Sequence, residues 1–141
     1  MTKSQISITW QAQSPKLLSI LRIVAAIVFI QSGTMKILGF PISMPAGFTA
    51  NFPSEIWFAG MLELLGGAML IIGLCTRPIA FVLSGEMAVA YFQAHAPQSI
   101  WTVVNHGGEA VLFCFIWLYI SAAGAGPWSL DAMRRKVRTF N

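Results

Sequence analysis

The sequence has few charged residues for its length. Only 10% of its 141 residues are Asp, Glu, Lys or Arg, whereas 56% are hydrophobic; soluble domains carry about 25% charged residues. A soluble domain of this size cannot bury so many apolar side chains, because a small chain has too much surface for its volume. The composition therefore excludes an ordinary soluble domain and predicts a protein whose apolar surface contacts a lipid bilayer.

Cysteine is also scarce, and no metal-binding or redox motif contains it. Cys75 and Cys114 form no CxxC pair and lie at the end and in the middle of apolar runs, so we expect no disulfide framework. The net charge of +4 does not come from basic residues interleaved with exposed aromatic ones, as a nucleic-acid surface would require. We therefore expect no nucleic-acid partner and attribute the positive charge to orientation in a membrane.

Four apolar runs have about the length of 20 residues that a helix needs to cross a bilayer. They cover about residues 17–38, 56–74, 78–95 and 102–122. The first run is longer than the apolar core of a signal peptide, so we interpret it as a retained membrane helix. The sequence predicts an all-α bundle of four transmembrane helices, a single domain over residues 1–141 with a basic tail over 129–141.

The basic residues predict the orientation of this bundle. Eight of the nine Lys and Arg residues lie on one side, and only Lys36 lies on the other. Cytoplasmic loops of membrane proteins carry an excess of Lys and Arg, so both termini are predicted to be cytoplasmic. We interpret Arg22 and Arg77 as topology anchors whose side chains extend toward the lipid headgroups.

Ionisable side chains at bilayer depth cost about 2.5–3.5 kcal/mol each on insertion scales, so each needs a partner or a function. Glu63, Glu86 and Glu109 lie at a similar depth on three predicted helices. Such a coincidence is improbable on lipid-facing surfaces, so we expect all three to face the bundle interior. Lys36 lies higher on the outer side and can reach toward them.

A candidate site follows from these positions. On a continuous fourth helix, Asn105 and Glu109 share one face, with His106 beside it. Gly66 and Gly67, one turn from Glu63, allow a neighbouring helix or a ligand to approach. The predicted catalytic residues are Glu63, Glu109, His106 and Lys36, and the predicted cofactor contacts are Glu63, His106, Asn105, Glu109, Gly66 and Gly67. Glu86, beside a ridge of small residues, is expected to form a hydrogen bond between helices.

With these residues placed, the sequence resembles the DoxX family of small four-helix inner-membrane proteins. The matching positions include Arg22 through Gly33 with Lys36, the run Gly60 to Gly67 with Thr76 and Arg77, the run Asn105 to Glu109, and the run Gly124 to Asp131. The resemblance covers about residues 16–131. It implies a multi-pass protein of a bacterial inner membrane, in a family tied to quinone-linked sulfur chemistry. The sequence departs from a self-sufficient oxidoreductase in having no cysteine placed for sulfur relay at the outer face.

The sequence leaves three classes of function open and does not decide whether the protein is an enzyme. The leading hypothesis is a membrane component of a quinone-linked redox system, whose electron donor is a partner subunit. The second is a metal- or haem-binding bundle, with His95 and His106 as axial ligands; its ligand set is short of that of di-iron bundles. The third is a non-catalytic assembly factor, chaperone-like protein or structural subunit, including one that forms homo-oligomers.

Overall fold

The computed structural model describes residues 3–44 and 50–138. These residues form helices and connecting segments without any β-strand, so the predicted all-α class is confirmed. The α-helices are α1 (Lys3–Leu38), α2 (Glu55–Ile72), α3 (Thr76–Ala90), α4 (Thr102–Asn105), α5 (Gly108–Ala123) and α6 (Leu130–Arg138), and a π-helical turn, η1 (Tyr91–His95), extends α3.

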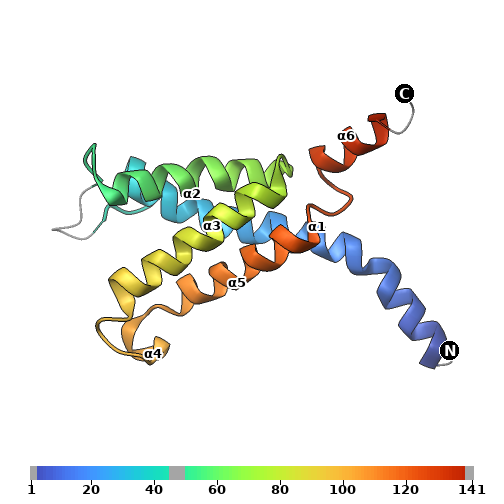
Figure 1. Ribbon diagram of the computed structural model, residues 1–141, viewed down its shortest axis with the longest axis horizontal. Coiled ribbons are helices and arrows are strands. Elements are labelled where there is room, and N and C mark those ends of the chain that lie inside the picture. Colours follow the sequence, from blue (N-terminus) through green and yellow to red (C-terminus); the bar gives the residue numbers. More distant parts are fainter. Residues whose placement is uncertain (1–2, 45–49, 139–141) are drawn as a thin grey trace.

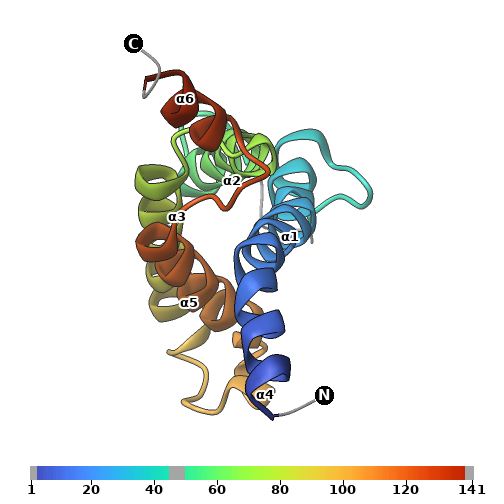
Figure 2. The same ribbon diagram turned by 90° about the vertical axis from the view of Figure 1, so that its right-hand side faces the viewer.

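Four of the helices surround a common core. α1 lies along α2, α3 lies along α5, and contacts between α2 and α3 and between α1 and α5 complete the ring (Figure 2). Phe29 of α1 packs edge-on against Phe113 and Trp117 of α5, with ring centroids 5.1 and 5.4 Å apart. All three side chains are buried, so aromatic contacts join α1 to α5 at the centre of the molecule.

The outer faces of these helices are apolar. Large hydrophobic side chains are exposed on each of them, including Val24 of α1, Leu65 of α2, Phe81 of α3 and Phe115 of α5. Two segments, Trp10–Leu38 and Glu55–Ile72, are long and apolar enough to cross a membrane, and α5 is apolar but shorter. An apolar exterior around a packed interior is the arrangement that lipid contact favours.

The first helix is longer than the sequence predicted. It begins at Lys3 and continues through Pro15, whereas the prediction placed its start near residue 17. A proline removes one intrahelical hydrogen bond but does not prevent helix on either side of it. The polar residues before Pro15 therefore extend α1 beyond the bundle, as Figure 1 shows at the blue end of the chain.

The predicted fourth helix is interrupted. α4 ends at Asn105, His106 adopts the left-handed conformation with φ of 55°, and α5 begins only at Gly108. The buried Asn105 side chain causes this break: its oxygen accepts from the Gly107 N–H at 2.7 Å, and its amide donates to the Ser99 carbonyl at 2.7 Å. Short polar side chains compete with helical hydrogen bonds in this way. The prediction that Asn105 and Glu109 share one helix face is therefore wrong.

Candidate functional site

Lys36 of α1 and Glu63 of α2 form an ion pair inside the molecule. The Lys36 Nζ lies 2.5 Å from Glu63 Oε1, and the Ser32 hydroxyl donates to the same oxygen at 3.3 Å. The Glu63 side chain is only 1% exposed and that of Lys36 only 18%. The predicted depths of the two residues in the membrane suggested that Lys36 can reach toward Glu63. In the structure the two side chains are in direct contact.

Two glycines allow α1 and α2 to approach closely at this pair. A Cβ atom on Gly33 would lie 2.7 Å from the backbone nitrogen of Leu64, and one on Gly60 would lie 2.9 Å from the Lys36 Cβ. Both distances are shorter than side-chain contacts tolerate. Sequence reasoning emphasised Gly66 and Gly67 instead; the signal for Gly33 and Gly60 was their helical spacing from Lys36 and Glu63.

Gly66 and Gly67 accommodate neighbouring helices. A Cβ on Gly66 would lie 3.0 Å from the side chain of Leu83 on α3, and one on Gly67 would lie 3.2 Å from Ile30 on α1. The close approach expected beside Glu63 is therefore present, and the groups that approach belong to the neighbouring helices α1 and α3.

Glu86 of α3 belongs to the same cluster by electrostatics but has no hydrogen bond. Its charge interacts with those of Glu63 and Lys36. Within residues 3–44 and 50–138, both of its carboxyl oxygens are buried without a hydrogen-bond partner, and so is Oε2 of Glu63. The expected hydrogen bond between helices at Glu86 is therefore absent from the described part of the chain. Ser84 forms one instead, donating to the Cys114 carbonyl at 2.8 Å. We call Lys36, Glu63 and Glu86 the carboxylate cluster.

The predicted site residues of the fourth helix lie outside this cluster. Glu109 is exposed in the first turn of α5 and does not face the interior as expected, although its charge still acts on Glu63. His106 is exposed at the helix break. Asn105 is buried, but its side chain holds the loop before α5. The break in the helix separates these three residues, which a continuous helix would have kept together.

An apolar groove of about 210 Å³ runs between α2 and α3. Along α2 it extends from Phe58 to Met69, past the level of Glu63, and Ile79, Val82 and Leu83 of α3 form its other wall. Its lining is almost entirely hydrophobic, so it suits a hydrocarbon chain.

At one end of the bundle, Arg22 is buried rather than extended toward lipid headgroups. Its side chain is 0% exposed. It donates to the carbonyls of Leu70 and Ile71 at the end of α2, and to those of Ala125 and Trp128 after α5. The interpretation that the Arg22 side chain extends toward the lipid headgroups is therefore wrong. The physical reason is that helix ends leave carbonyls unpaired, and a guanidinium group with five donors can satisfy several of them.

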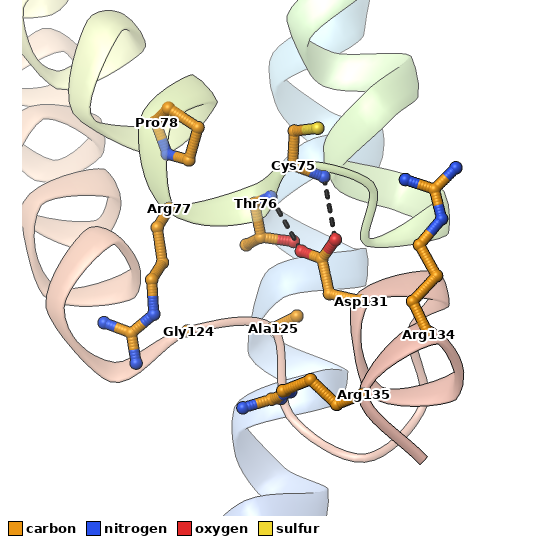
Figure 3. Close-up of a pocket in the computed structure, with 9 residues that line it drawn as sticks. All are labelled: Cys75, Thr76, Arg77, Pro78, Gly124, Ala125, Asp131, Arg134 and Arg135. Atoms are coloured by element: carbon orange, nitrogen blue, oxygen red, sulfur yellow. Dashed lines mark hydrogen bonds between the residues drawn. The ribbon is translucent and has the colours of Figure 1, made fainter. Parts of the chain in front are cut away.

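Arg77 and Asp131 also bind helix ends. Arg77 is exposed and donates to the carbonyls of Ser121 and Ala122 at the end of α5. The Asp131 carboxylate accepts from the backbone N–H groups of Cys75 at 2.9 Å and Thr76 at 2.8 Å (Figure 3). Burial alone would raise the pKa of Asp131, but these hydrogen bonds and the charge of Arg134 outweigh it and lower the pKa below its ordinary value. Asp131 thus caps α3 as a carboxylate.

These residues border a second cavity, of about 400 Å³, which we call the basic pocket. Arg77, Arg134, Arg135 and Asp131 are its charged lining residues. Figure 3 shows Arg77 to the left of Gly124, Arg135 below the Gly124–Ala125 segment, and Arg134 to the right of Asp131. Sequence reasoning treated these arginines as topology signals and did not predict a pocket.

Comparison with known proteins identifies the family. A model of the DoxX family matches residues 17–96, more than half of the chain. An uncharacterized protein of Haemophilus influenzae is 44% identical over 120 residues, which cover 83% of this chain and 90% of the relative. The chain belongs to the DoxX family. An uncharacterized membrane protein of Mycobacterium tuberculosis is similar to this DoxX protein at 23% identity over 143 residues, covering 91% of this chain and 87% of the relative. No solved structure matches it.

The resemblance noted from the sequence is therefore confirmed, and the chain is a membrane protein. The family match contains the whole carboxylate cluster as well as Arg22 and Arg77, and it ends before Glu109 and Asp131. In the described residues of this DoxX protein, no group of three or more His, Cys, Asp or Glu side chains is arranged to hold a metal ion. His95, considered as a haem ligand, instead contacts the Asn105 carbonyl through Nδ1 at 2.8 Å.

Proposed function

We propose that this DoxX-family protein is a multi-pass subunit of a bacterial inner membrane that crosses the bilayer four times, with both termini in the cytoplasm. The spans are α1, α2, α3 with its extension η1, and α5. Residues 76–95 of α3 and η1 have a helical length of about 30 Å, which matches the hydrocarbon core. The α2–α3 turn and α6 lie at one end and segment 39–44 with α4 at the other (Figure 1), and the positive-inside rule favours the first end as cytoplasmic.

The function that this geometry supports best is that of a quinone-binding component of a redox system. The observation that carries the proposal is the carboxylate cluster, in which Glu63 Oε2 and both oxygens of Glu86 are buried without a partner in the described residues. Buried polar atoms are nearly always hydrogen-bonded. A protonated carboxyl group can donate a hydrogen bond. A quinone carbonyl can accept it, and the rest of a quinone is apolar enough to bind in a site lined by hydrocarbon side chains.

The cluster also has the chemistry that quinone reduction needs. Conversion of a quinone to a quinol takes up two electrons and two protons. The Glu86 carboxyl can deliver one proton as a general acid, and the ammonium of the Lys36–Glu63 ion pair can deliver the second. Before that transfer, the same ammonium can stabilise negative charge on a quinone oxygen. The exposed Glu109 and His106 lie on the outer side, where they can return protons to the cluster. The electrons come from a partner subunit that carries a redox centre.

The neighbouring groove supports binding of the rest of such a ligand. Quinones of bacterial membranes carry long hydrocarbon tails, and the groove between α2 and α3 is apolar and is lined by Leu62 and Gly66, which are one and three residues from Glu63 in the chain. A ligand whose polar head meets the cluster and whose tail follows the groove would satisfy both regions. Among the residues that the structure describes, no charged or polar side chain lines that groove.

Binding of a short-chain ubiquinone to the full-length protein in nanodiscs tests this proposal. Glu63→Gln and Glu86→Gln should each weaken binding about tenfold, since a hydrogen bond involving a charged or strongly polar group contributes about 1.5–3 kcal/mol. Glu55→Gln is the matched control, because Glu55 is exposed at the start of α2 and its substitution changes the charge equally.

The outcomes separate the function classes that the sequence left open. Absence of quinone binding by the unmodified protein would overturn the proposal. If Glu63→Gln and Glu86→Gln lower only thermal stability, the carboxylate cluster is a structural network and the protein a non-catalytic subunit. An equal loss of binding in Glu55→Gln would show that the effect is one of charge and not of the cluster.

A further inference from the structure

The basic pocket contains none of the residues of the carboxylate cluster, and the proposed redox function does not use it. Its charged lining consists of Arg77 from α3, Arg134 and Arg135 from α6, and Asp131. The arginines therefore exceed the acid by two charges. Asp131 directs both carboxylate oxygens to the N–H groups of Cys75 and Thr76 (Figure 3), so its charge stabilises the start of α3.

We propose that this pocket binds the phosphate of an anionic phospholipid. Guanidinium groups match phosphate geometry and form strong, charge-assisted hydrogen bonds with it. Arg77 is held in place by the carbonyls at the end of α5, while Arg134 and Arg135 line the pocket from a different helix, α6. A volume of about 400 Å³ leaves room for a headgroup and not only for a small inorganic ion.

The surface around the pocket favours a lipid over a soluble phosphate. Met133 and Val137 of α6 are 62% and 64% exposed, and they lie four residues apart on one helix face. Trp128, two residues before the start of α6, is 54% exposed. Basic amphipathic helices of this kind lie in the headgroup region with their apolar side toward the acyl chains, and indole rings are enriched at the same depth. A lipid phosphate in the pocket and acyl chains beneath Met133 and Val137 would engage both features.

Lipid binding to the full-length protein in a neutral detergent tests this inference. Native mass spectrometry should show phosphatidylglycerol bound at least tenfold more tightly than phosphatidylcholine with the same acyl chains. The double variant Arg134→Gln/Arg135→Gln should weaken phosphatidylglycerol binding about 30-fold, because each basic group near an anionic lipid contributes about fivefold. The control is Lys16→Gln/Lys136→Gln, which removes the same charge at two exposed positions that do not line the pocket, and it should lose less than threefold.

Three results would overturn the inference. Equal affinity of the unmodified protein for both phospholipids would exclude a site for the anionic headgroup, and this comparison needs no variant to fold. Equal losses in the two double variants would indicate a diffuse surface charge and not a pocket. Binding of inorganic phosphate as tightly as phosphatidylglycerol would identify a site for a soluble anion. None of these measurements depends on quinone binding, so failure here leaves the carboxylate cluster's proposed role unaffected.

Discussion

The basic end and the carboxylate cluster of this DoxX protein differ in how far their charged groups are hydrogen-bonded. At the basic end, Arg22 donates to four backbone carbonyls and both oxygens of Asp131 accept backbone N–H groups. In the carboxylate cluster, near the middle of α2 and α3, Glu63 Oε2 and both oxygens of Glu86 are buried without a partner in the described residues. Satisfied buried charges fix a structure, whereas unsatisfied ones lower its stability. The comparison indicates that the charged groups of the basic end stabilise the fold, and it supports the proposal that the carboxylate cluster binds a ligand or protons.

The largest expected effect is the loss of Arg22. Arg22→Met keeps much of the side-chain volume but leaves carbonyls of α2 and of the segment after α5 without a donor. Each unsatisfied buried group costs about 1–3 kcal/mol, so we expect a loss of about 4 kcal/mol in the free energy of unfolding. Denaturant titration of the purified protein in detergent measures it.

Lys16→Met is the control for this prediction. Lys16 lies on the same helix but is exposed, so its substitution should change the free energy of unfolding by less than about 0.5 kcal/mol. If the two substitutions had equal effects, Arg22 would contribute through charge alone, and the contrast between the basic end and the carboxylate cluster would lose its main support.

The next effect concerns the ion pair itself. Lys36→Met leaves Glu63 buried beside an apolar side chain, and breaking a buried pair from one side costs about 3 kcal/mol. The double variant Lys36→Met/Glu63→Met removes both charges and should recover to within about 1 kcal/mol of the unmodified protein. A double-mutant cycle on the free energy of unfolding measures the coupling. A double variant that is as unstable as Lys36→Met would show that the pair is not the relevant interaction.

Asp131→Ala should have a smaller effect, because it removes a helix cap at the surface. Loss of such a cap costs about 1–2 kcal/mol. The folded state lowers the pKa of Asp131 below its ordinary value of 3.8, so the stabilising contribution is fully present above pH 3.8 and is lost as the pH falls through the lower, folded value. The stability difference between the unmodified protein and Asp131→Ala should therefore be constant from neutral pH down to about pH 5 and shrink below pH 4. A difference that stays constant to pH 2 would contradict the assigned role.

Much of the fold follows from composition and periodicity, because lipid contact requires long apolar helices and the sequence contains them. The proximity of Lys36 and Glu63 follows as well, since an unpaired charge inside a membrane is costly and opposite charges at a similar depth therefore form pairs. The break at His106 was not predictable from hydropathy. It depends on a local side-chain competition, in which Asn105 bonds to Gly107 and Ser99, and apolar residues on both sides of the break conceal it.

The role of Arg22 was missed for a related reason. A basic residue near the end of an apolar run is typical of a topology anchor, and only the tertiary arrangement shows that the end of α2 and the segment after α5 converge on it. The signal in the sequence was the cluster of helix terminators, with Gly73 after α2 and Gly124 and Gly126 after α5. Helix ends that meet in the interior need donors for their carbonyls, and Arg22 lies at their level.

The smallest effect on stability is expected at Glu86, and it distinguishes the carboxylate cluster from the basic end most sharply. Glu86→Gln replaces a buried carboxyl that has no partner in the described residues by an amide of the same shape, which cannot ionise beside Glu63. We therefore expect the free energy of unfolding to rise by up to about 1 kcal/mol, whereas substitutions at the basic end lower it. If Glu86→Gln keeps or raises the stability but abolishes quinone binding, Glu86 is a functional group. Active sites contain groups that lower the stability of the fold and are retained for function. A loss of more than about 1 kcal/mol would instead show that Glu86 has a stabilising partner, and would place the carboxylate cluster in the same structural class as Arg22.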